Sequence, residues 1–488
     1  MSRSTKSKPW YRPRNVFPPV LAVILTIVGW LTYLMYWALT VQPNPSTDYA
    51  KKLEELSAAS QPLGENAWPI LMEAARILQE VETELSNRDD DFDPFDFEPI
   101  YLVDTSLEVL SNLQHTIAEL RAAGAFDQLA LAAQRPNAVR LHSYPPDESL
   151  IFQTIPDVAQ LRRLARARIA SMYQALAQGD ADEAVAALDQ TLYLAQVNTH
   201  QSLIIEQLVG RAIAAAAAGR LRQALMHDQL DATTYAQLLK TFQRRLPLGP
   251  TKIALQGERL IMLDMIQHVY SDDGAGGGRL LLAEIGDMVQ MTGAGSFTSR
   301  PKGEGLAIVN LGGFFYANRT EITETANEFF DHLIRLSTLS RADRRADPFD
   351  ENAVFEKLDW RYMPLNMLMP ALGRAIDARD AIDCDLAGTI IMLALEQYRA
   401  QTGQYPDSLE ELAPAILEEI PSDPFSVDGF VYRKLADEPL GKGYVLYSIG
   451  ADGVDNNGAT DSIETRNAFS DRHGRGLDFV LNAPRSEK

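Results

Sequence analysis

Three pieces of sequence near the C-terminus decide the fold of this chain: LEQYRAQTGQYPDSLEEL (395–412), IPSDPFSVDGFVYR (420–433) and GYVLYSIGADGVDNNGATD (443–461). The first piece predicts the end of a helix, because apolar residues lead to Gly403, which supplies a left-handed stop. Tyr405-Pro406 then favours an extended dipeptide. Asp407 or Ser408 is placed to cap a short helix that follows.

The second and third pieces alternate apolar and polar residues, which predicts two short strands. Phe430 and Tyr432 are expected on one face, and Tyr444, Leu446 and Ser448 on another. The C-terminal part of the chain is therefore predicted to be a small α+β domain.

A loop rich in glycine and in side-chain oxygens follows the second strand. Ca²⁺ takes six to eight oxygen ligands, so carboxylate and amide side chains close together in sequence favour a calcium site. The candidate ligands are Asp452, Asp455, Asn457 and Asp461. The same side chains can instead cap the backbone of the loop by local hydrogen bonds, and the sequence leaves this alternative open.

These features in this order resemble the globular head of the major pseudopilin of type II secretion systems. The matching residues are Tyr398, Gly403, Tyr405-Pro406, Asp423-Pro424-Phe425, Tyr432, Tyr444 and Ser448 to Gly453. The resemblance covers residues 380–465, and it implies a long helix on a small sheet with a calcium loop at 448–461. The alternative is an unrelated α+β module whose loop is rich in Asp, Asn and Gly.

The N-terminal part of the chain departs from the pseudopilin pattern. Pseudopilins begin with a leader that ends in Gly, followed by an apolar helix with Glu at its fifth mature position. Here the segment Asn15-Val16-Phe17-Pro18-Pro19 holds neither residue. We therefore expect neither processing by prepilin peptidase nor packing into a filament.

Residues 16–41 carry no charge and are long enough to form one transmembrane helix. No small-x-small cleavage site follows them. Five basic residues lie in the basic tail 1–15, which places the N-terminus in the cytoplasm by the positive-inside rule. The prediction is a single-pass protein of the bacterial inner (cytoplasmic) membrane, with its bulk in the periplasm.

Composition excludes some classes of function. The chain has 488 residues, 46% of them hydrophobic, which is ordinary for a folded protein. Its net charge is −21, and beyond residue 15 the remaining 40 basic residues against 66 acidic ones leave −26, so a nucleic-acid partner is not expected. The single cysteine, Cys384, lies beside an apolar run and is predicted to be a buried structural thiol.

The body of the chain is predicted to be helical, because apolar residues recur at spacings of three and four. A helical domain is expected over 48–245, with helices at 49–59, 67–85, 106–123, 158–177, 182–197 and 202–225. Around Gln178-Gly179-Asp180 the sequence resembles one tetratricopeptide-type hairpin, without a repeat on either side. An Ala-rich helical bundle and a peptide-binding groove both fit it. The acidic segment 89–98 is predicted to be an exposed loop.

A second helical region with Gly-rich loops is expected over 246–375, followed by the pseudopilin-like domain over 376–488. The expected helices are 251–270, 321–339, 353–357, 363–378 and 380–400. The glycine-containing tracts 271–278 and 293–313 lack the Gly-Lys-Ser/Thr ending of a phosphate loop, so exposed flexible loops are expected.

No catalytic signature is present in the sequence. The seven histidines show no His-Glu-x-x-His spacing, and there is no Gly-x-Ser-x-Gly elbow. We expect a protein that is not an enzyme, with a structural or assembly role beside a type II secretion-like system. One alternative is a peptide- or polymer-binding module in the helical body. The other is a membrane-bound hydrolase whose site the sequence does not reveal.

Overall fold

The computed structural model describes residues 13–59, 64–88, 107–140, 149–152, 156–227, 230–246, 254–285, 304–346, 358–435, 442–458 and 478–482. The predicted acidic loop 89–98, the predicted helix 353–357 and the predicted calcium ligand Asp461 lie outside these residues. Within them the chain is mainly helical, with one small antiparallel sheet, as predicted.

The chain divides into two compact units, each assembled from segments that are far apart in sequence. Unit 1 comprises residues 1–48, 262–326 and 356–367. Unit 2 comprises residues 49–261, 327–355 and 368–488. Boundaries between the two sets of residues fall within three helices: α10 (Gln256–Val269), α13 (Arg319–Leu336) and α16 (Met363–Thr402). The predicted domain boundary at 375/376 falls inside α16.

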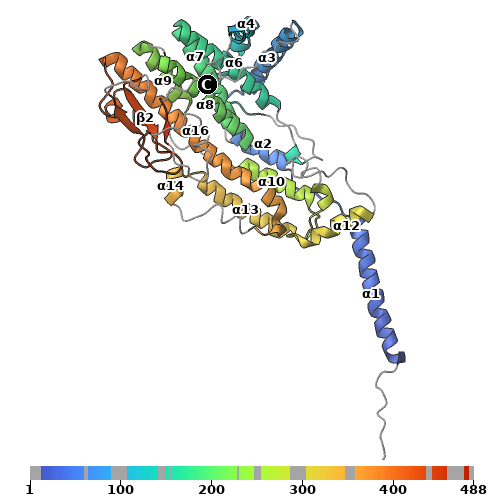
Figure 1. Cartoon of the computed structure of the whole chain (residues 1–488). Coiled ribbons are helices and arrows are strands. Elements are labelled where there is room, and N and C mark those ends of the chain that lie inside the picture. The colour runs from blue at the N-terminus through green and yellow to red at the C-terminus, as the bar shows by residue number, and fades with distance from the viewer. Residues whose placement is uncertain are drawn as a thin grey trace, which may run out of the picture. The chain divides into compact units, whose positions relative to one another are not determined.

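Unit 1 begins with α1 (Pro13–Thr40), a long apolar helix (Figure 1). Its stretch Val20–Thr40 has 21 residues and a mean hydropathy of 1.9, so it is long and apolar enough to cross a membrane. The other short elements of unit 1 are α12 (Glu304–Gly312), η3 (Gly313–Phe315) and η4 (Trp360–Tyr362). The loop predicted over 293–313 is therefore wrong for its described part, 304–313, which is helical.

The first glycine-containing tract of unit 1 forms a closed loop between α10 and a short bridge at Leu280. The Asp273 carboxylate accepts hydrogen bonds from the amides of Ala275 and Gly277. Gly276 has a positive φ of 84°, and its carbonyl accepts a hydrogen bond from Thr320 at the start of α13. The loop is exposed at 272–275, as predicted, and these bonds define its path.

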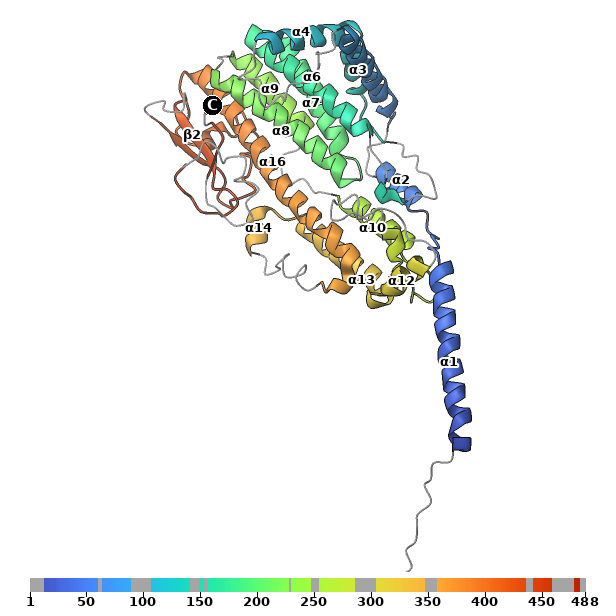
Figure 2. The same ribbon diagram turned by 45° about the vertical axis from the view of Figure 1, so that its right-hand side comes forward.

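Unit 2 is built on a stack of helices, of which α6 to α9 pack against one another (Figures 1 and 2). The elements are α2 (Tyr49–Ala59), α3 (Trp68–Arg88), α4 (Leu107–Ala122), α5 (Ala125–Ala132), η2 (Leu150–Phe152), α6 (Pro156–Gln178), α7 (Ala181–Thr199), α8 (Ile204–His227), α9 (Ala232–Arg245) and α14 (Arg341–Ala346). The predicted helices of this region are confirmed to within a few residues, and α5, α9 and α14 were not predicted.

The hairpin of α6 and α7 forms where the sequence predicts it. Gly179 adopts a φ of 72° between the helices, and the Asp180 carboxylate accepts a hydrogen bond from the Glu183 amide as the N-cap of α7. Small residues then allow close packing of α7 on α8. A Cβ atom on Gly210 would lie 2.5 Å from the Ala195 carbonyl oxygen, so glycine is required at this contact.

The two helices predicted at 363–378 and 380–400 are one continuous helix, α16, and the predicted break is wrong. The charged residues at the position of this break are buried and paired. Arg379 has no exposed surface and donates hydrogen bonds to the Ser337 and Leu339 carbonyls and to Asp380. The break in hydrophobicity therefore marks a packed polar contact and not a turn.

The sheet contains β1 (Val431–Lys434), β2 (Tyr444–Ser448) and β3 (Phe479–Val480) in antiparallel order. Tyr432 pairs with Leu446, so these residues share one face instead of lying on different faces. That face joins the main hydrophobic core of unit 2, to which α16 contributes Ile391 and Leu395. Cys384 of α16 is fully buried, as predicted. Ser408 caps the short helix η5 (Leu409–Leu412) in a capping box, also as predicted.

Candidate functional site

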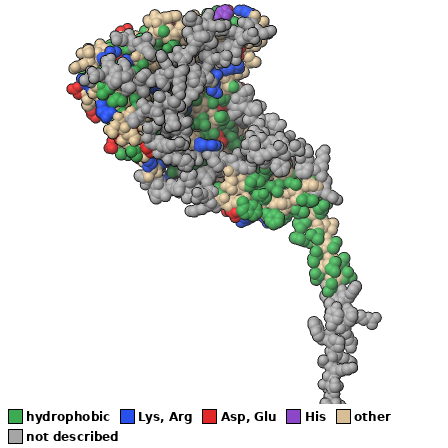
Figure 3. Space-filling view, in the orientation of Figure 1, with side chains coloured by type: hydrophobic (Ala, Val, Ile, Leu, Met, Phe, Trp, Pro, Cys, Tyr) green, Lys and Arg blue, Asp and Glu red, His purple; other side chains and the backbone are tan. Residues whose placement is uncertain are grey.

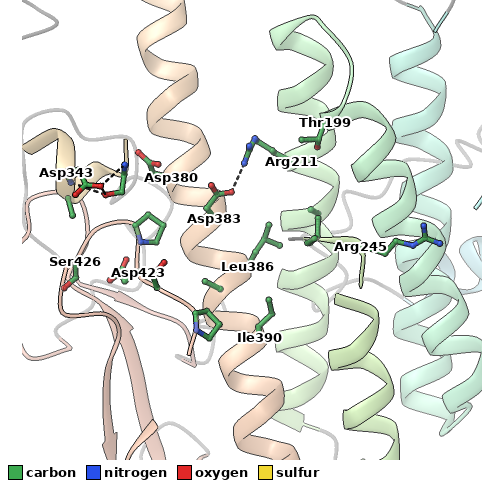
Figure 4. A pocket seen from close by; sticks show the side chains of 18 of the residues that line it. Thr199, Arg211, Arg245, Asp343, Asp380, Asp383, Leu386, Ile390, Asp423 and Ser426 are labelled. Carbon is green, nitrogen blue, oxygen red and sulfur yellow. Dashed lines mark hydrogen bonds and ion pairs between the residues drawn. The ribbon is translucent and has the colours of Figure 1, made fainter. Parts of the chain in front are cut away.

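A cavity of about 380 Å³ opens inside unit 2, between α7 and α8 on one side and α16 with the segment 421–427 on the other (Figure 4). Its apolar lining is Ala214, Leu246, Leu386, Ala387, Ile390, Pro421, Pro424 and Val427. Its charged and polar lining includes Gln196, Thr199, His200, Arg211, Arg245, Asp343, Asp380, Asp383 and Asp423. Apolar walls with a few polar groups are typical of a ligand site.

An ion pair crosses the cavity between α8 and α16 (Figure 4). Arg211 Nη1 lies 2.6 Å from Asp383 Oδ1, and the two side chains are only 4% and 12% exposed. Burial lowers the pKa of Arg211, and the Asp383 carboxylate opposes this shift. A second pair, Arg222 with Asp385 at 2.5 Å, joins the same two helices further along. Charge pairing therefore fixes α16 against α8.

The other carboxylates of the helical wall are also engaged. Asp380 lies 2.6 Å from Arg379 and 2.7 Å from Arg344. Asp343 accepts hydrogen bonds from the hydroxyl and the amide of Ser340. On the opposite wall, Arg245 binds Asp189 at 2.6 Å. These contacts neutralise most of the charge that lines the cavity.

Asp423 differs from the other cavity carboxylates. It is 3% exposed, and its Oδ1 accepts a hydrogen bond of 2.8 Å from the Phe425 amide, a local turn that Pro424 favours by fixing φ. No donor among the described residues meets hydrogen-bond geometry with Oδ2. Burial raises the pKa of Asp423 to about 6, although the nearby Ser448 hydroxyl, the Phe425 amide and the Cys384 thiol favour the charged form.

His200 is the histidine of the cavity lining, where it ends α7 as the C-cap residue. Burial lowers the pKa of His200, so the imidazole is mainly neutral at pH 7. A neutral imidazole beside carboxylates has the composition of an acid–base site. Because Asp380 and Asp383 are paired with arginines, these two carboxylates are poor partners for proton transfer with His200.

The loop predicted to bind calcium is described from Gly450 to Gly458. Asp452 Oδ1 accepts a hydrogen bond from the Val454 amide, and Asp455 Oδ1 accepts two, from the Asn457 amide and the Tyr447 hydroxyl. Asn457 adopts a φ of 62°, which asparagine tolerates. Hydrogen bonds of the loop with itself thus occupy one oxygen of each of the two carboxylates.

Asp478 joins this loop from beyond the predicted ligands. Its carboxylate accepts hydrogen bonds from the Asn456 and Gly458 amides, the latter at 2.6 Å. Burial raises the pKa of Asp478, and the charges of Asp455 and Asp452 raise it further. Three carboxylates are therefore close enough to repel one another, which a bound cation would relieve. Among the described residues, however, no group of three such side chains has the geometry of a metal site.

The sequence predicted none of the cavity residues as a site. Asp423 stands in the Asp-Pro-Phe segment that carries the pseudopilin resemblance, which implies no site at this residue. Charges next to apolar runs were the available signal: Arg211 precedes the run Ala214–Ala218, and Asp383 precedes the apolar run Leu386–Leu395 of α16.

Comparisons with known proteins add no relative. No protein-family model matches the sequence, and neither a curated protein nor a solved structure matches the chain.

Proposed function

We propose that this chain is a non-catalytic, membrane-anchored binding protein of a bacterial envelope. The cavity of unit 2 takes the positively charged group of its ligand. The single observation that carries the proposal is the buried carboxylate of Asp423, which lines the cavity and whose Oδ2 meets no donor in hydrogen-bond geometry within the described part of the chain.

The charge balance of the cavity supports a cationic ligand. Asp380 and Asp383 are held by arginines, and Asp343 is held by Ser340. Arg345 is the cation that most favours the charged form of Asp423. Burial nevertheless raises the pKa of Asp423. A protonated amine or guanidinium placed at Oδ2 would remove the cost of this buried charge.

The apolar walls support a ligand with an aliphatic stem. Leu386, Ile390 and Pro424 lie on the cavity surface with Asp423. A Lys or Arg side chain has an apolar stem and a charged head, so both parts of such a residue find a matching surface. We therefore expect the ligand to be a basic segment of another envelope protein. An assembly role beside a type II secretion-like system, which the pseudopilin resemblance implies, is consistent with this ligand.

A membrane-bound hydrolase is the second candidate, because the cavity gathers His200 with several carboxylates. Acid–base chemistry needs a proton donor and an acceptor that are both available to the substrate. Two of the four carboxylates are tied to arginines, and Asp343 accepts from Ser340. The arrangement favours binding over catalysis.

The proposed topology follows from α1 and the charges that flank it. The five basic residues among the first 15 positions favour a cytoplasmic N-terminus, which places unit 2 and its cavity in the periplasm. A binding site in the periplasm would be accessible to another protein of the envelope.

The full-length protein in detergent allows a direct test with two matched probes. Nα-acetyl-lysine amide and Nα-acetyl-norleucine amide share the aliphatic stem and differ in the charged group. We expect the lysine compound to raise the melting temperature more than the norleucine compound at pH 8. The advantage should fall below pH 6 as Asp423 becomes protonated.

The variants Asp423→Asn and Asp428→Asn complete the test, since Asp428 is exposed on the same loop. Asp423→Asn should abolish the advantage of the lysine compound, and Asp428→Asn should keep it. An equal response of the two variants would refute the proposed site. Turnover of a peptide or ester substrate that is lost in Asp423→Asn would favour the hydrolase instead.

A further inference from the structure

Unit 1 exposes large apolar side chains next to the end of α1. Ile308 is 68% exposed, Phe314 41%, Phe315 70% and Trp360 60%. These four residues are called the apolar face below. Figure 3 shows apolar side chains gathered over α12 beside those of α1. A contiguous exposed apolar surface marks an interaction site.

Two contacts hold the apolar face against the last turn of α1. The Asn310 side chain, which is 3% exposed, donates a hydrogen bond of 3.0 Å to the Ala38 carbonyl. The rings of Trp37 and Phe314 pack edge to face with centroids 5.1 Å apart. The apolar face is therefore fixed beside the C-terminal end of α1.

The segment that carries the apolar face is two-sided. Ala307, Asn310 and Gly313 are buried at a spacing of three residues, while Ile308 and Phe315 are exposed. No charged residue occurs from 305 to 318, so the exposed side has no charge of its own. A helix that presents one apolar side and packs by the other suits the surface of a membrane.

The length of α1 places this segment at the membrane boundary. The 21 residues of Val20–Thr40 extend about 32 Å as a helix, close to the roughly 30 Å thickness of a hydrocarbon core. When α1 spans the bilayer, Ala38 lies within one turn of the boundary. Trp360, packed on Tyr316 with ring centroids 5.6 Å apart, then lies where aromatic side chains concentrate in membrane proteins.

We propose that the apolar face is a second membrane contact, which inserts into the leaflet at the C-terminal end of α1. Ile308 and Phe315 enter the acyl region, and Trp360 lies at the headgroups. The inference rests on the proposed anchoring by α1. A lipid occupant is favoured because the exposed apolar surface adjoins the exposed surface of α1, which lipid covers.

The contact also has a consequence for unit 1. A single helix can rotate and tilt in a bilayer, and a second insertion beside it restrains both motions. Unit 1 is then held at a defined depth and orientation at the membrane surface.

Site-specific fluorescence in proteoliposomes tests the contact. Cys384 is the single cysteine of the chain and is fully buried, so a maleimide-linked nitrobenzoxadiazole dye can be attached selectively to an introduced cysteine. The labelled variants of the full-length chain are Val28→Cys in α1, Ile308→Cys and Phe315→Cys in the apolar face, and Val427→Cys in unit 2. Vesicles of phosphatidylcholine and phosphatidylglycerol are prepared with and without lipids that carry a nitroxide quencher on the acyl chain.

We expect the dye at positions 28, 308 and 315 to emit at shorter wavelength and to lose most of its emission with the nitroxide lipid. The dye at Val427, which is 83% exposed, should do neither. Quenching at 28 without quenching at 308 and 315 would overturn the inference and leave the anchor intact. Absence of quenching at 28 would instead refute the anchor. A blue shift at 308 and 315 without quenching would mean that protein, such as a second copy of the chain, covers the apolar face, and this also overturns the inference.

Discussion

Arg211 of α8 lies 2.6 Å from Asp383 of α16, although 172 residues separate the two in the sequence. Both side chains are largely buried, and their ion pair joins the helical stack to the helix that supports the sheet. The C-terminal part that carries the sheet is therefore bonded to the helical body within unit 2.

The Arg211–Asp383 pair should be costly to break and less costly to replace. Asp383→Ala removes the carboxylate that pairs with the buried Arg211 guanidinium, so we expect a loss of about 3–5 kcal/mol in the free energy of unfolding. The double variant Arg211→Met, Asp383→Leu should recover part of that loss, because no unpaired charge remains. Chemical denaturation measures both changes.

A surface pair provides the control for this experiment. Arg76 and Glu73 form an ion pair with both side chains at least 43% exposed. Arg76→Ala should leave the denaturation midpoint nearly unchanged. If Asp383→Ala behaved like Arg76→Ala, the pair would not hold α16 against α8.

Local features of this fold could be predicted from the sequence, because each depends on neighbouring residues. Gly179-Asp180 marked the turn between α6 and α7, and Ser408 marked the start of η5. The uncharged segment of α1 was also evident. In each case a few adjacent side chains decide the backbone conformation.

The cavity could not be predicted because it depends on contacts between distant segments. A run such as Arg379-Asp380 looks like a solvated break until Ser337 and Leu339 are found to accept its hydrogen bonds. The pKa of Asp423 likewise depends on Cys384 of α16, which comes close to Asp423 only in the fold. Asp478, which binds the loop 450–458, directly precedes β3, a strand too short to show a period of two.

Glu206 should make the stability of unit 2 depend on pH. It is fully buried between Arg140 at 3.1 Å and the Leu203 amide, and burial raises its pKa from 4.5 to about 7. The folded state therefore binds a proton that the unfolded state releases between these values. As the pH falls from above 7 to 4.5, this group adds to the free energy of unfolding, and below 4.5 its contribution is constant.

The variant Glu206→Gln isolates this contribution. It keeps an acceptor for the Leu203 amide, and Arg140 keeps Asp157 at 3.2 Å. We expect the difference in melting temperature between Glu206→Gln and the natural protein to change between pH 5 and pH 8, with the variant gaining relative stability at the higher pH. The exposed substitution Glu84→Gln serves as control. A difference that stays constant across this range would contradict the raised pKa.

The orientation of the chain in the membrane is testable with reporter fusions. The basic residues among the first 15 positions favour a cytoplasmic N-terminus. A reporter that is active only outside the cytoplasm, fused after Lys488, should therefore be active. Changing Lys6, Lys8, Arg12 and Arg14 to Glu should lower that activity, because the charge step is then reversed. Activity of a cytoplasm-only reporter at Lys488 of the unmodified chain would show the opposite orientation.

The loop 450–458 is the remaining candidate for a cation, and it binds calcium in our prediction. Repulsion among Asp452, Asp455 and Asp478 favours an ion, which takes six to eight oxygens at about 2.3–2.6 Å. The opposing feature is that amides of the loop already occupy oxygens of all three carboxylates. A site that must compete with these bonds should be weak, with a dissociation constant of roughly 10⁻⁴–10⁻³ M.

Thermal melting of the full-length protein in detergent decides between the ion and the self-capped loop. Calcium at about 100 times its dissociation constant should add roughly 2.7 kcal/mol to the stability of the folded state. We expect this gain in the natural protein and in Asp428→Asn, whose side chain is exposed outside the loop. Asp452→Ala should lose most of it, because one carboxylate is removed while the bonds of Asp455 and Asp478 remain. A melting temperature that is the same in calcium and in EDTA, or an equal gain in Asp452→Ala, would leave the loop as a turn that its own hydrogen bonds hold.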